Sequence, residues 1–193
     1  MKKHAKTIII VSLMVALGLG YFYYLANRTP SKDATEQSIR DEEIAALTTR
    51  DINDNYPESP REVVKFYVRI TKAYYNGNVS DENIEKLAKQ ARLLFDDELK
   101  NSQTEADFLE KLKQEISEYK SLGRYISDYK IESGTYTQYK KMNGAEYASI
   151  KTLYYIREGS NLNNTYTKFV LRKDSEGRWK ILYWELTDSA SFD

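Results

Sequence analysis

The sequence predicts an α+β protein that consists of an N-terminal transmembrane helix and of three helices packed on a curved four-stranded antiparallel sheet. Three observations predict this fold class. Residues 8–25 form an uncharged apolar run, the apolar residues between 60 and 122 recur every three or four positions, and those after Gly123 recur every second position. Helices that precede an antiparallel sheet are typical of a domain whose helices lie on one face of the sheet.

The apolar run from Ile8 to Leu25 predicts a membrane-spanning helix at about residues 7–26. Eighteen residues of helix cover about 27 Å, which is close to the hydrocarbon thickness of a bilayer. Three lysines precede the run and three tyrosines close it, which favours a cytoplasmic N-terminus. We therefore expect a single-pass signal-anchor protein of the cell membrane with its C-terminal domain extracytoplasmic. The alternative is a cleaved signal peptide, because Ala16-Leu17-Gly18 resembles a small-residue cleavage site.

The rest of the chain divides by composition. Residues 1–27 hold the basic flank and the anchor, and residues 28–55 are polar, which predicts a stalk. Ile39, Ile44 and Leu47 allow at most a short helix within this stalk. We expect one folded domain at 56–188 and a tail at 189–193, because this length suits a single compact core.

Three helices are predicted at the start of the domain. Ser59 before Pro60 provides an N-cap and a first helical residue. A second helix begins at Ser80 or Asp81, and a third begins at Thr104. The apolar stripe of the first helix is Val63, Phe66, Tyr67, Ile70, Ala73 and Tyr74.

Four strands are predicted after the helices. Residues 125–132 alternate between apolar and charged, and Asn143-Gly144 is a tight-turn signal before strands at 145–157, 166–173 and 178–187. Trp179 and Trp184 are an odd number of residues apart, which predicts that they lie on opposite faces of the last strand. Apolar residues occur on both faces of the sheet, so we expect the second face to be covered or to curl around a pocket.

Composition excludes several classes of function. The chain has no cysteine, which excludes disulfides and thiolate chemistry, and its single histidine, His4, precedes the apolar run. After the first thirty residues the net charge is −4, from 25 basic and 29 acidic residues, so we do not expect nucleic acid as a partner. We expect no cofactor, no metal and no catalytic residue. Asp96-Asp97-Glu98 is interpreted as a solvated helix end rather than as a metal site.

The run from Leu171 to Ile181, a charged turn followed by Gly177-Arg178-Trp179, resembles a hairpin of exported bacterial members of the nuclear-transport-factor-2-like superfamily. With the segment from Tyr56 to Val64, the region also resembles an uncharacterised family of membrane-anchored bacterial proteins. The resemblance covers about residues 53–187 and implies a cystatin-like, cone-shaped α+β fold whose sheet wraps the first helix. The superfamily contains isomerases, dehydratases and non-catalytic binding modules, so this fold does not determine the function.

The chain contains seventeen tyrosines, which combine a flat apolar ring with a hydroxyl. They suit the recognition of a ligand or a protein at a partly wet surface, although strands also favour tyrosine. Our leading hypothesis is a non-catalytic accessory module of the cell envelope that binds a small ligand or an envelope protein. We name Tyr67, Tyr74, Tyr129 and Trp184 as pocket lining. The alternative interpretation of these four residues is ordinary core packing.

Two further hypotheses use the same elements differently. The first is a small-molecule isomerase or hydrolase that uses a buried aspartate or tyrosine. The second is a structural homodimer that pairs through the open face of the sheet. A cone filled by side chains and without a buried acid argues against the enzyme, and a strict monomer argues against the homodimer.

Overall fold

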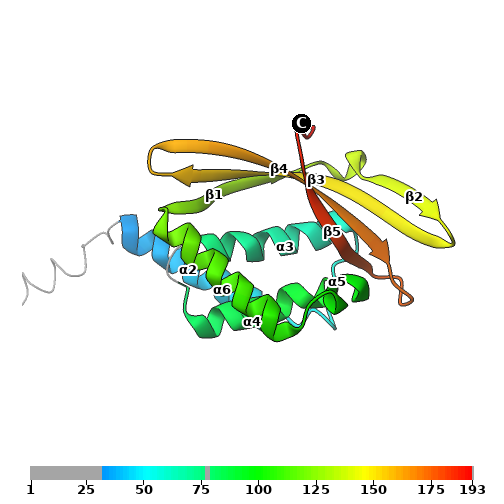
Figure 1. Cartoon of the computed structure of the whole chain (residues 1–193), viewed down its shortest axis with the longest axis horizontal. Helices are drawn as coiled ribbons and strands as arrows, with labels where there is room; N and C mark the ends of the chain where they lie inside the picture. Colours follow the sequence, from blue (N-terminus) through cyan, green and yellow to red (C-terminus); the bar gives the residue numbers. More distant parts are fainter. Residues whose placement is uncertain (1–31, 77–78, 193) are drawn as a thin grey trace, which may run out of the picture. The chain divides into compact units, whose positions relative to one another are not determined.

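The computed structural model describes residues 32–76 and 79–192. The chain forms two units, residues 1–39 and residues 40–193. In the first unit, the described residues are the first turns of helix α2 (Lys32–Thr49), in which residues 34–39 are exposed. The second unit holds the remainder of α2, the other helices and the sheet (Figure 1).

After α2, the described residues form four α-helices and five strands with one 3-10 turn. The elements are α3 (Pro60–Tyr75), α4 (Asp81–Leu93), α5 (Asp97–Asn101), α6 (Glu105–Ser121), β1 (Arg124–Ile131), η1 (Gly134–Tyr136), β2 (Gln138–Met142), β3 (Ala145–Glu158), β4 (Asn161–Lys173) and β5 (Trp179–Thr187). Helices therefore precede strands along the whole domain, as the change of apolar period predicted.

The five strands form one antiparallel sheet with the order β1-β3-β4-β5, and β2 pairs with the start of β3. In this register Ile150 on β3 pairs with Phe169 on β4, and Phe169 pairs with Trp184 on β5. Directly paired residues of an antiparallel sheet point to the same face. These three side chains therefore share the face of the sheet that meets the helices.

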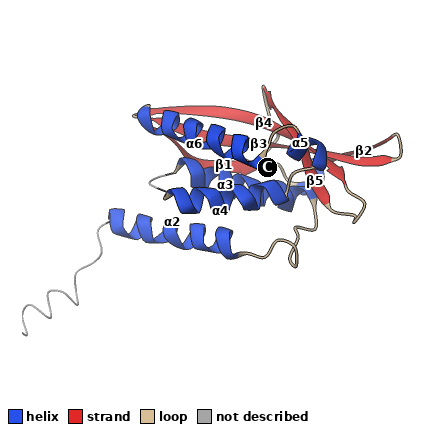
Figure 2. Ribbon diagram, turned by 60° about the horizontal axis from the view of Figure 1, so that its bottom comes forward, coloured by secondary structure: helices blue, strands red, loops and turns tan. Residues whose placement is uncertain are grey.

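Helix α3 packs against this helix-facing side, where it contacts β1, β3 and β5 (Figures 1 and 2). The side chains of Val63, Val64, Val68 and Ile70 are 0% exposed, because α3 is covered by the sheet on one side and by other helices on the other. Helices α4 and α6 pack on α3 and on each other. The core of the second unit thus lies between the sheet and a layer of helices.

The predicted starts of three helices are confirmed. The Ser59 hydroxyl accepts a hydrogen bond from the Glu62 backbone N–H at 3.2 Å, and the Thr104 hydroxyl accepts one from the Asp107 N–H at 3.1 Å. Ser80 caps α4 in the same way. Each hydroxyl satisfies one of the backbone donors that a helix leaves free at its first turn.

The predicted architecture is wrong in its number of elements, because the described residues form five α-helices and five strands rather than three and four. Helix α2 falls within the predicted stalk, where Ile44 and Leu47 are buried although most other positions are polar. Helix α5 is a short helix capped by Asp96. Strand β2 is exposed at every position, so no alternation marks it, and only the Asn143-Gly144 turn indicated a hairpin there.

The transmembrane part of the predicted architecture is also corrected. Within residues 32–76 and 79–192, no helix is long and apolar enough to span a bilayer. The segment that we expected to cross the membrane, residues 7–26, lies outside the described residues. The single-pass signal-anchor is therefore not an element of the fold described here, and the location of the domain in the cell stays a prediction.

The prediction that the two tryptophans of β5 lie on opposite faces is wrong. Leu182 has no partner on β4, so the alternation of β5 shifts by one position between Trp179 and Trp184. Trp179 is 7% exposed within the hydrophobic core, and the ring of Trp184 lies 5.4 Å from the ring of Tyr67 on α3. Both tryptophans therefore lie on the helix-facing side of the sheet.

A crossing between the end of α4 and strand β5 closes one end of the core. Phe95 forms a parallel bridge with Ile181. The Ile181 N–H donates to the Leu94 carbonyl at 2.8 Å, and the Asp96 N–H donates to the Ile181 carbonyl at 2.8 Å. This crossing places the Phe95 ring, which is 1% exposed, inside the core.

The side chain of Asp96 reinforces the same crossing. It is 5% exposed, it accepts a hydrogen bond from the Glu98 backbone N–H at 2.9 Å, and it pairs with Arg172 on β4 through an Nε–Oδ2 contact of 3.0 Å. The interpretation of the acidic cluster as a solvated helix end is therefore wrong for Asp96, although Asp97 and Glu98 are exposed. A buried carboxylate needs this ion pair and these hydrogen bonds, because desolvation penalises an unpaired charge.

Candidate ligand-binding site

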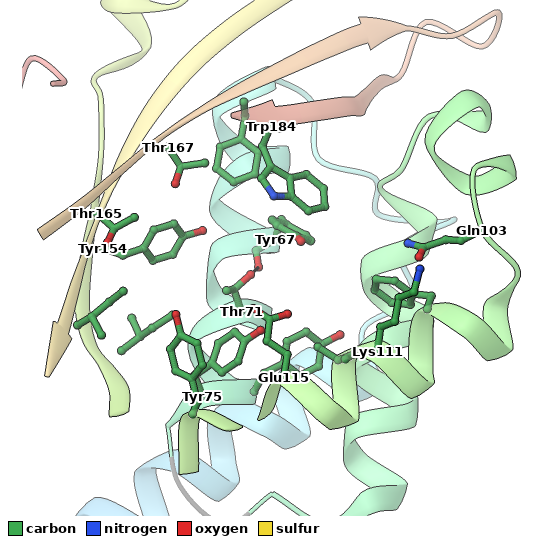
Figure 3. A pocket seen from close by; sticks show the side chains of 17 residues that line it. Tyr67, Thr71, Tyr75, Gln103, Lys111, Glu115, Tyr154, Thr165, Thr167 and Trp184 are labelled. Carbon is green, nitrogen blue, oxygen red and sulfur yellow. Dashed lines mark hydrogen bonds between the residues drawn. The ribbon is translucent and has the colours of Figure 1, made fainter. Parts of the chain in front are cut away.

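A cavity of about 370 Å³ lies between α3, α6 and the helix-facing side of the sheet. In Figure 3, Tyr154 and Thr165 approach it from strands β3 and β4, Tyr67 and Thr71 from α3, and Glu115 from α6. This volume is at the lower end of the range for small-molecule sites in proteins. The cavity therefore has room for a compact organic ligand.

Aromatic rings form two groups in the walls of the cavity. In the first, which we name the Trp184 group, the ring centroid of Tyr67 lies 5.4 Å from that of Trp184 and 5.7 Å from that of Phe169. In the second, the Tyr75 group, the centroids of Tyr75 and Tyr119 lie 4.4 Å apart. Rings at these distances form apolar walls that suit a flat or aliphatic ligand body.

Hydroxyl groups line the space between the two ring groups. Burial raises the pKa of Tyr67 and of Tyr154 well above the ordinary value of 10.0, and hydrogen bonding with the Thr71 side chain offsets this in part. Both phenols therefore keep their protons at neutral pH. They are suited to hydrogen bonding with a ligand, and they are poorly suited to act as bases or nucleophiles.

The Tyr74 hydroxyl is buried and lacks a hydrogen-bond partner among residues 32–76 and 79–192. The residue lines the cavity and is 3% exposed. A buried hydroxyl without a partner costs about 1–3 kcal/mol relative to a satisfied one. The hydroxyl oxygen itself is closed off from solvent, so the open space of the cavity does not reach it.

The charged residues that line the cavity are Lys111 and Glu115, which lie one helical turn apart on α6 and are both exposed. Together with the half-buried Gln103 they form one side of the mouth (Figure 3). Burial raises the pKa of Tyr75 and of Tyr119, and the negative charge of Glu115 raises it further. The Glu115 carboxylate therefore acts on the Tyr75 group from the mouth of the cavity.

The structure brings three of the four predicted pocket residues together. Tyr67, Tyr74 and Trp184 line the cavity between α3, α6 and the sheet. Tyr129 lines a separate surface hollow, and Lys72 lies over its ring at 5.8 Å from the centroid. Tyr67 and Tyr74 lie together because they share the apolar stripe of α3, and Trp184 joins them because the alternation of β5 is shifted. Whether these residues bind a ligand stays a prediction.

Sequence reasoning did not single out Thr71, Tyr154 or Glu115 as lining residues. Thr71 lies four positions after Tyr67 and so shares its face of α3. Tyr154 shares the parity of Ile150 on β3 and therefore faces the helices. Glu115 lies three positions after Leu112 and so borders the apolar stripe of α6. The periodicity of each element thus indicates that these residues lie near the core. They were not singled out because polar residues beside an apolar stripe are usually solvated.

The outer face of the sheet, opposite the helices, is partly covered by its own side chains. Leu153 is 4% exposed on this face, where its register neighbours are Lys130 and Tyr166. Tyr183 and Leu162 are 44% and 51% exposed on the same face. A homodimer through this face stays a prediction.

The part of the chain that the structure describes contains no set of side chains that matches a metal site. No group of three or more histidine, aspartate or glutamate side chains is placed there to hold a metal ion. The buried carboxylate of Asp96 is engaged by Arg172. The chemistry of the candidate site is therefore that of aromatic rings, hydroxyl groups and the two charged residues at its mouth.

Comparison with known proteins identifies a family. No curated protein matches the chain. Residues 1–184 match the model of a family described as a domain of unknown function (DUF6715). The matched range includes α3, α6 and the strands that form the cavity, and it reaches Trp184. The chain therefore belongs to the DUF6715 family.

Proposed function

We propose that the domain is a non-catalytic binding module that takes up a small organic ligand in the cavity between α3, α6 and the sheet. The observation that carries this proposal is a cavity walled by two groups of aromatic rings, with hydroxyl-bearing residues between them. Hydroxyl groups donate and accept hydrogen bonds with a ligand. The surrounding rings supply apolar contact for the rest of the ligand.

The composition of the lining favours binding over catalysis. Glu115 is the acidic residue among the described residues that line the cavity, and it is exposed at the mouth. The raised pKa values of Tyr67 and Tyr154 keep both hydroxyls protonated. General acid–base catalysis requires a group whose pKa lies near the working pH, and the lining offers none of this kind deep in the cavity.

A nuclear-transport-factor-2-like relationship fits this proposal. It is supported by α3 lying against the helix-facing side of an antiparallel sheet and by a cavity between them. Because that superfamily contains both enzymes and binding modules, the relationship alone does not decide the function. The proposal therefore rests on the residues in the cavity wall rather than on the superfamily.

The test is a melting-temperature screen of the full-length protein against small organic molecules, with one variant that fills the cavity and one that does not. Thr165 on β4 lines the cavity, whereas its neighbour Asn164 is exposed and pairs with Tyr155 on the outer face. Thr165→Phe places a ring in the cavity, and Asn164→Phe places the same ring on the opposite face.

A true cavity ligand raises the melting temperature of the native protein and of Asn164→Phe but leaves that of Thr165→Phe unchanged. At a hundred times its dissociation constant, such a ligand stabilises the protein by about 2.7 kcal/mol. A ligand that stabilises both variants equally binds elsewhere. A library without any cavity-dependent ligand contradicts the proposed function.

A further inference from the structure

The mouth of the cavity has an uneven distribution of charge. Among the described lining residues, Lys111 and Glu115 are the charged pair at the mouth, and the deeper wall consists of rings, aliphatic side chains and hydroxyls. A ligand that carries a charge must therefore place it near one of these two side chains, because an unpaired charge in the deeper wall would be desolvated without compensation.

Of these two charged residues, Glu115 is the one whose charge acts on the aromatic rings. After burial, its charge is the next cause that raises the pKa of Tyr67, Tyr75 and Tyr119. Tyr75 and Tyr119 form the Tyr75 group, and Tyr67 belongs to the Trp184 group. The negative charge of Glu115 therefore acts on both groups of rings. In Figure 3, Glu115 lies beside Tyr75 and below Thr71.

The Tyr75 group places closely spaced rings in the same part of the cavity wall as Glu115. The centroids of Tyr75 and Tyr119 are 4.4 Å apart, and those of Tyr74 and Tyr75 are 6.3 Å apart with nearly perpendicular planes. Several aromatic rings next to one carboxylate are the arrangement that attracts an organic cation, because the face of each ring is negative. A carboxylate ligand would meet repulsion at the same place.

We propose that the ligand carries an ammonium group on an apolar body. The ammonium group lies against Tyr75 and Tyr119 and pairs with Glu115, while the apolar body lies against Phe108 and the Trp184 group. This inference rests on the proposed function, since it assumes that the cavity binds a small ligand. It adds the charge of that ligand and the end of the cavity at which the charge is bound.

Lys111 gives the proposal a second, opposite consequence. It precedes Glu115 by four residues on α6, so the two side chains lie on the same face of the helix. The positive charge of Lys111 therefore disfavours a ligand cation at this end of the cavity. Removal of Lys111 is expected to strengthen the binding of a cation, whereas removal of the Glu115 charge weakens it.

The test uses three probes of similar size and different charge, titrated into the full-length protein by calorimetry. They are 2-phenylethylamine, which is an ammonium ion at neutral pH, uncharged 2-phenylethanol and anionic 3-phenylpropanoate. The amine is expected to bind about tenfold more tightly than the alcohol. Glu115→Gln is expected to reduce this preference to about twofold or less, and Lys111→Met to increase amine affinity by about threefold.

Glu110→Gln is the matched control, because Glu110 is an exposed residue of α6 that does not line the cavity. It is expected to leave all three affinities unchanged, which separates a local effect from a change in net charge. Equal binding of amine and alcohol that is insensitive to Glu115→Gln overturns the ammonium assignment and leaves the binding function standing. Tightest binding of the anion, lost in Lys111→Met, overturns it in favour of an acidic ligand. Failure of all three probes to bind contradicts the binding function itself.

Discussion

The helix-facing side of the sheet has two halves that differ in packing. In the packed half, formed around Ala148, Ile150, Leu171 and Ile181, every one of these side chains is at most 1% exposed. In the open half, the strands carry hydroxyl-bearing residues and the cavity separates them from α6. The same two strands, β3 and β4, run through both halves.

The difference follows from the side chains and from the crossing chain. The packed half has aliphatic residues on the sheet, and the bridge at Phe95 brings another segment against β5. In the open half, Thr167 and Tyr154 replace aliphatic residues on the same face, and α6 approaches with Glu115 and Tyr119. Buried polar atoms need hydrogen-bond partners, which limits the ways in which a neighbouring helix can pack on them. One half therefore stabilises the fold, and the other half leaves a site.

The largest expected effect tests whether stability is concentrated in the packed half. Leu171→Ala removes a side chain that is 0% exposed, and it is expected to lower the free energy of unfolding by about 2–5 kcal/mol. Ile156→Ala in the open half removes a half-buried side chain that already borders the cavity, so its cost is expected to be about 1 kcal/mol. Denaturant unfolding measures both values. Equal losses would contradict the division into two halves.

The next effect concerns the crossing that closes the packed half. Asp96→Ala removes the buried partner of Arg172 and the cap of α5, and leaves Arg172 with the exposed Glu98 alone, so we expect a loss of about 2 kcal/mol in the free energy of unfolding. Asp97→Ala, at an exposed position of the same acidic cluster that pairs with Lys100 instead, is expected to cost about 0.5 kcal/mol or less. If thermal unfolding shows similar losses for the two variants, the Asp96 ion pair does not hold the crossing.

A third effect sharpens the contrast through pH. Burial holds the pKa of Tyr154 in the folded protein above its ordinary value of 10.0, so its stabilising effect is complete below pH 10 and is lost as the pH rises further. Tyr154→Phe is expected to remove up to about 1.4 kcal/mol per pH unit from this alkaline loss of stability. The measurement is the slope of unfolding free energy against pH above 10. Equal slopes for the native protein and the variant would show that this phenol ionises freely in the open half.

The smallest expected effect compares the half-buried phenol of Tyr56 with the buried phenol of Tyr74. The Tyr56 hydroxyl donates a hydrogen bond to the Trp179 carbonyl at 2.8 Å, whereas the Tyr74 hydroxyl lacks a partner in the described residues. Tyr56→Phe is expected to cost about 1 kcal/mol, and Tyr74→Phe about 0 kcal/mol or to stabilise the protein slightly. Melting temperatures without ligand test this order. A clear loss in Tyr74→Phe would mean that its hydroxyl already has a partner in the empty protein.

Periodicity predicted the parts of the fold in which one face of an element is strongly apolar. The stripe of α3 is of this kind, and it placed Tyr67 and Tyr74 correctly in the helix layer. Strand β2 escaped prediction because none of its positions is buried. Helix α2 was underestimated because, of its residues 34–49, only Ile44 and Leu47 are buried.

The candidate site was harder to predict than the fold, for two physical reasons. An unpaired residue, Leu182, shifts the alternation of β5, and no local pattern in the sequence marks that shift. Tyr129 shares the helix-facing side with Tyr154, its direct partner in the register, but the two line different hollows. Periodicity predicts only the face of the sheet on which a residue lies. Tertiary packing decides on which side of the covering helix that residue ends up, and so which hollow it lines.

The crossing at Phe95 also bears on the order in which the chain becomes stable during its synthesis. The paired residues Asp96 and Arg172 are separated by 76 positions, and Ile181 lies further still along the chain. When α3 and α4 leave the ribosome, the strands that cover α3 have not yet been made. The sheet-facing side of α3 therefore cannot be covered until β1 and the later strands emerge, and apolar surface exposed in this way favours aggregation.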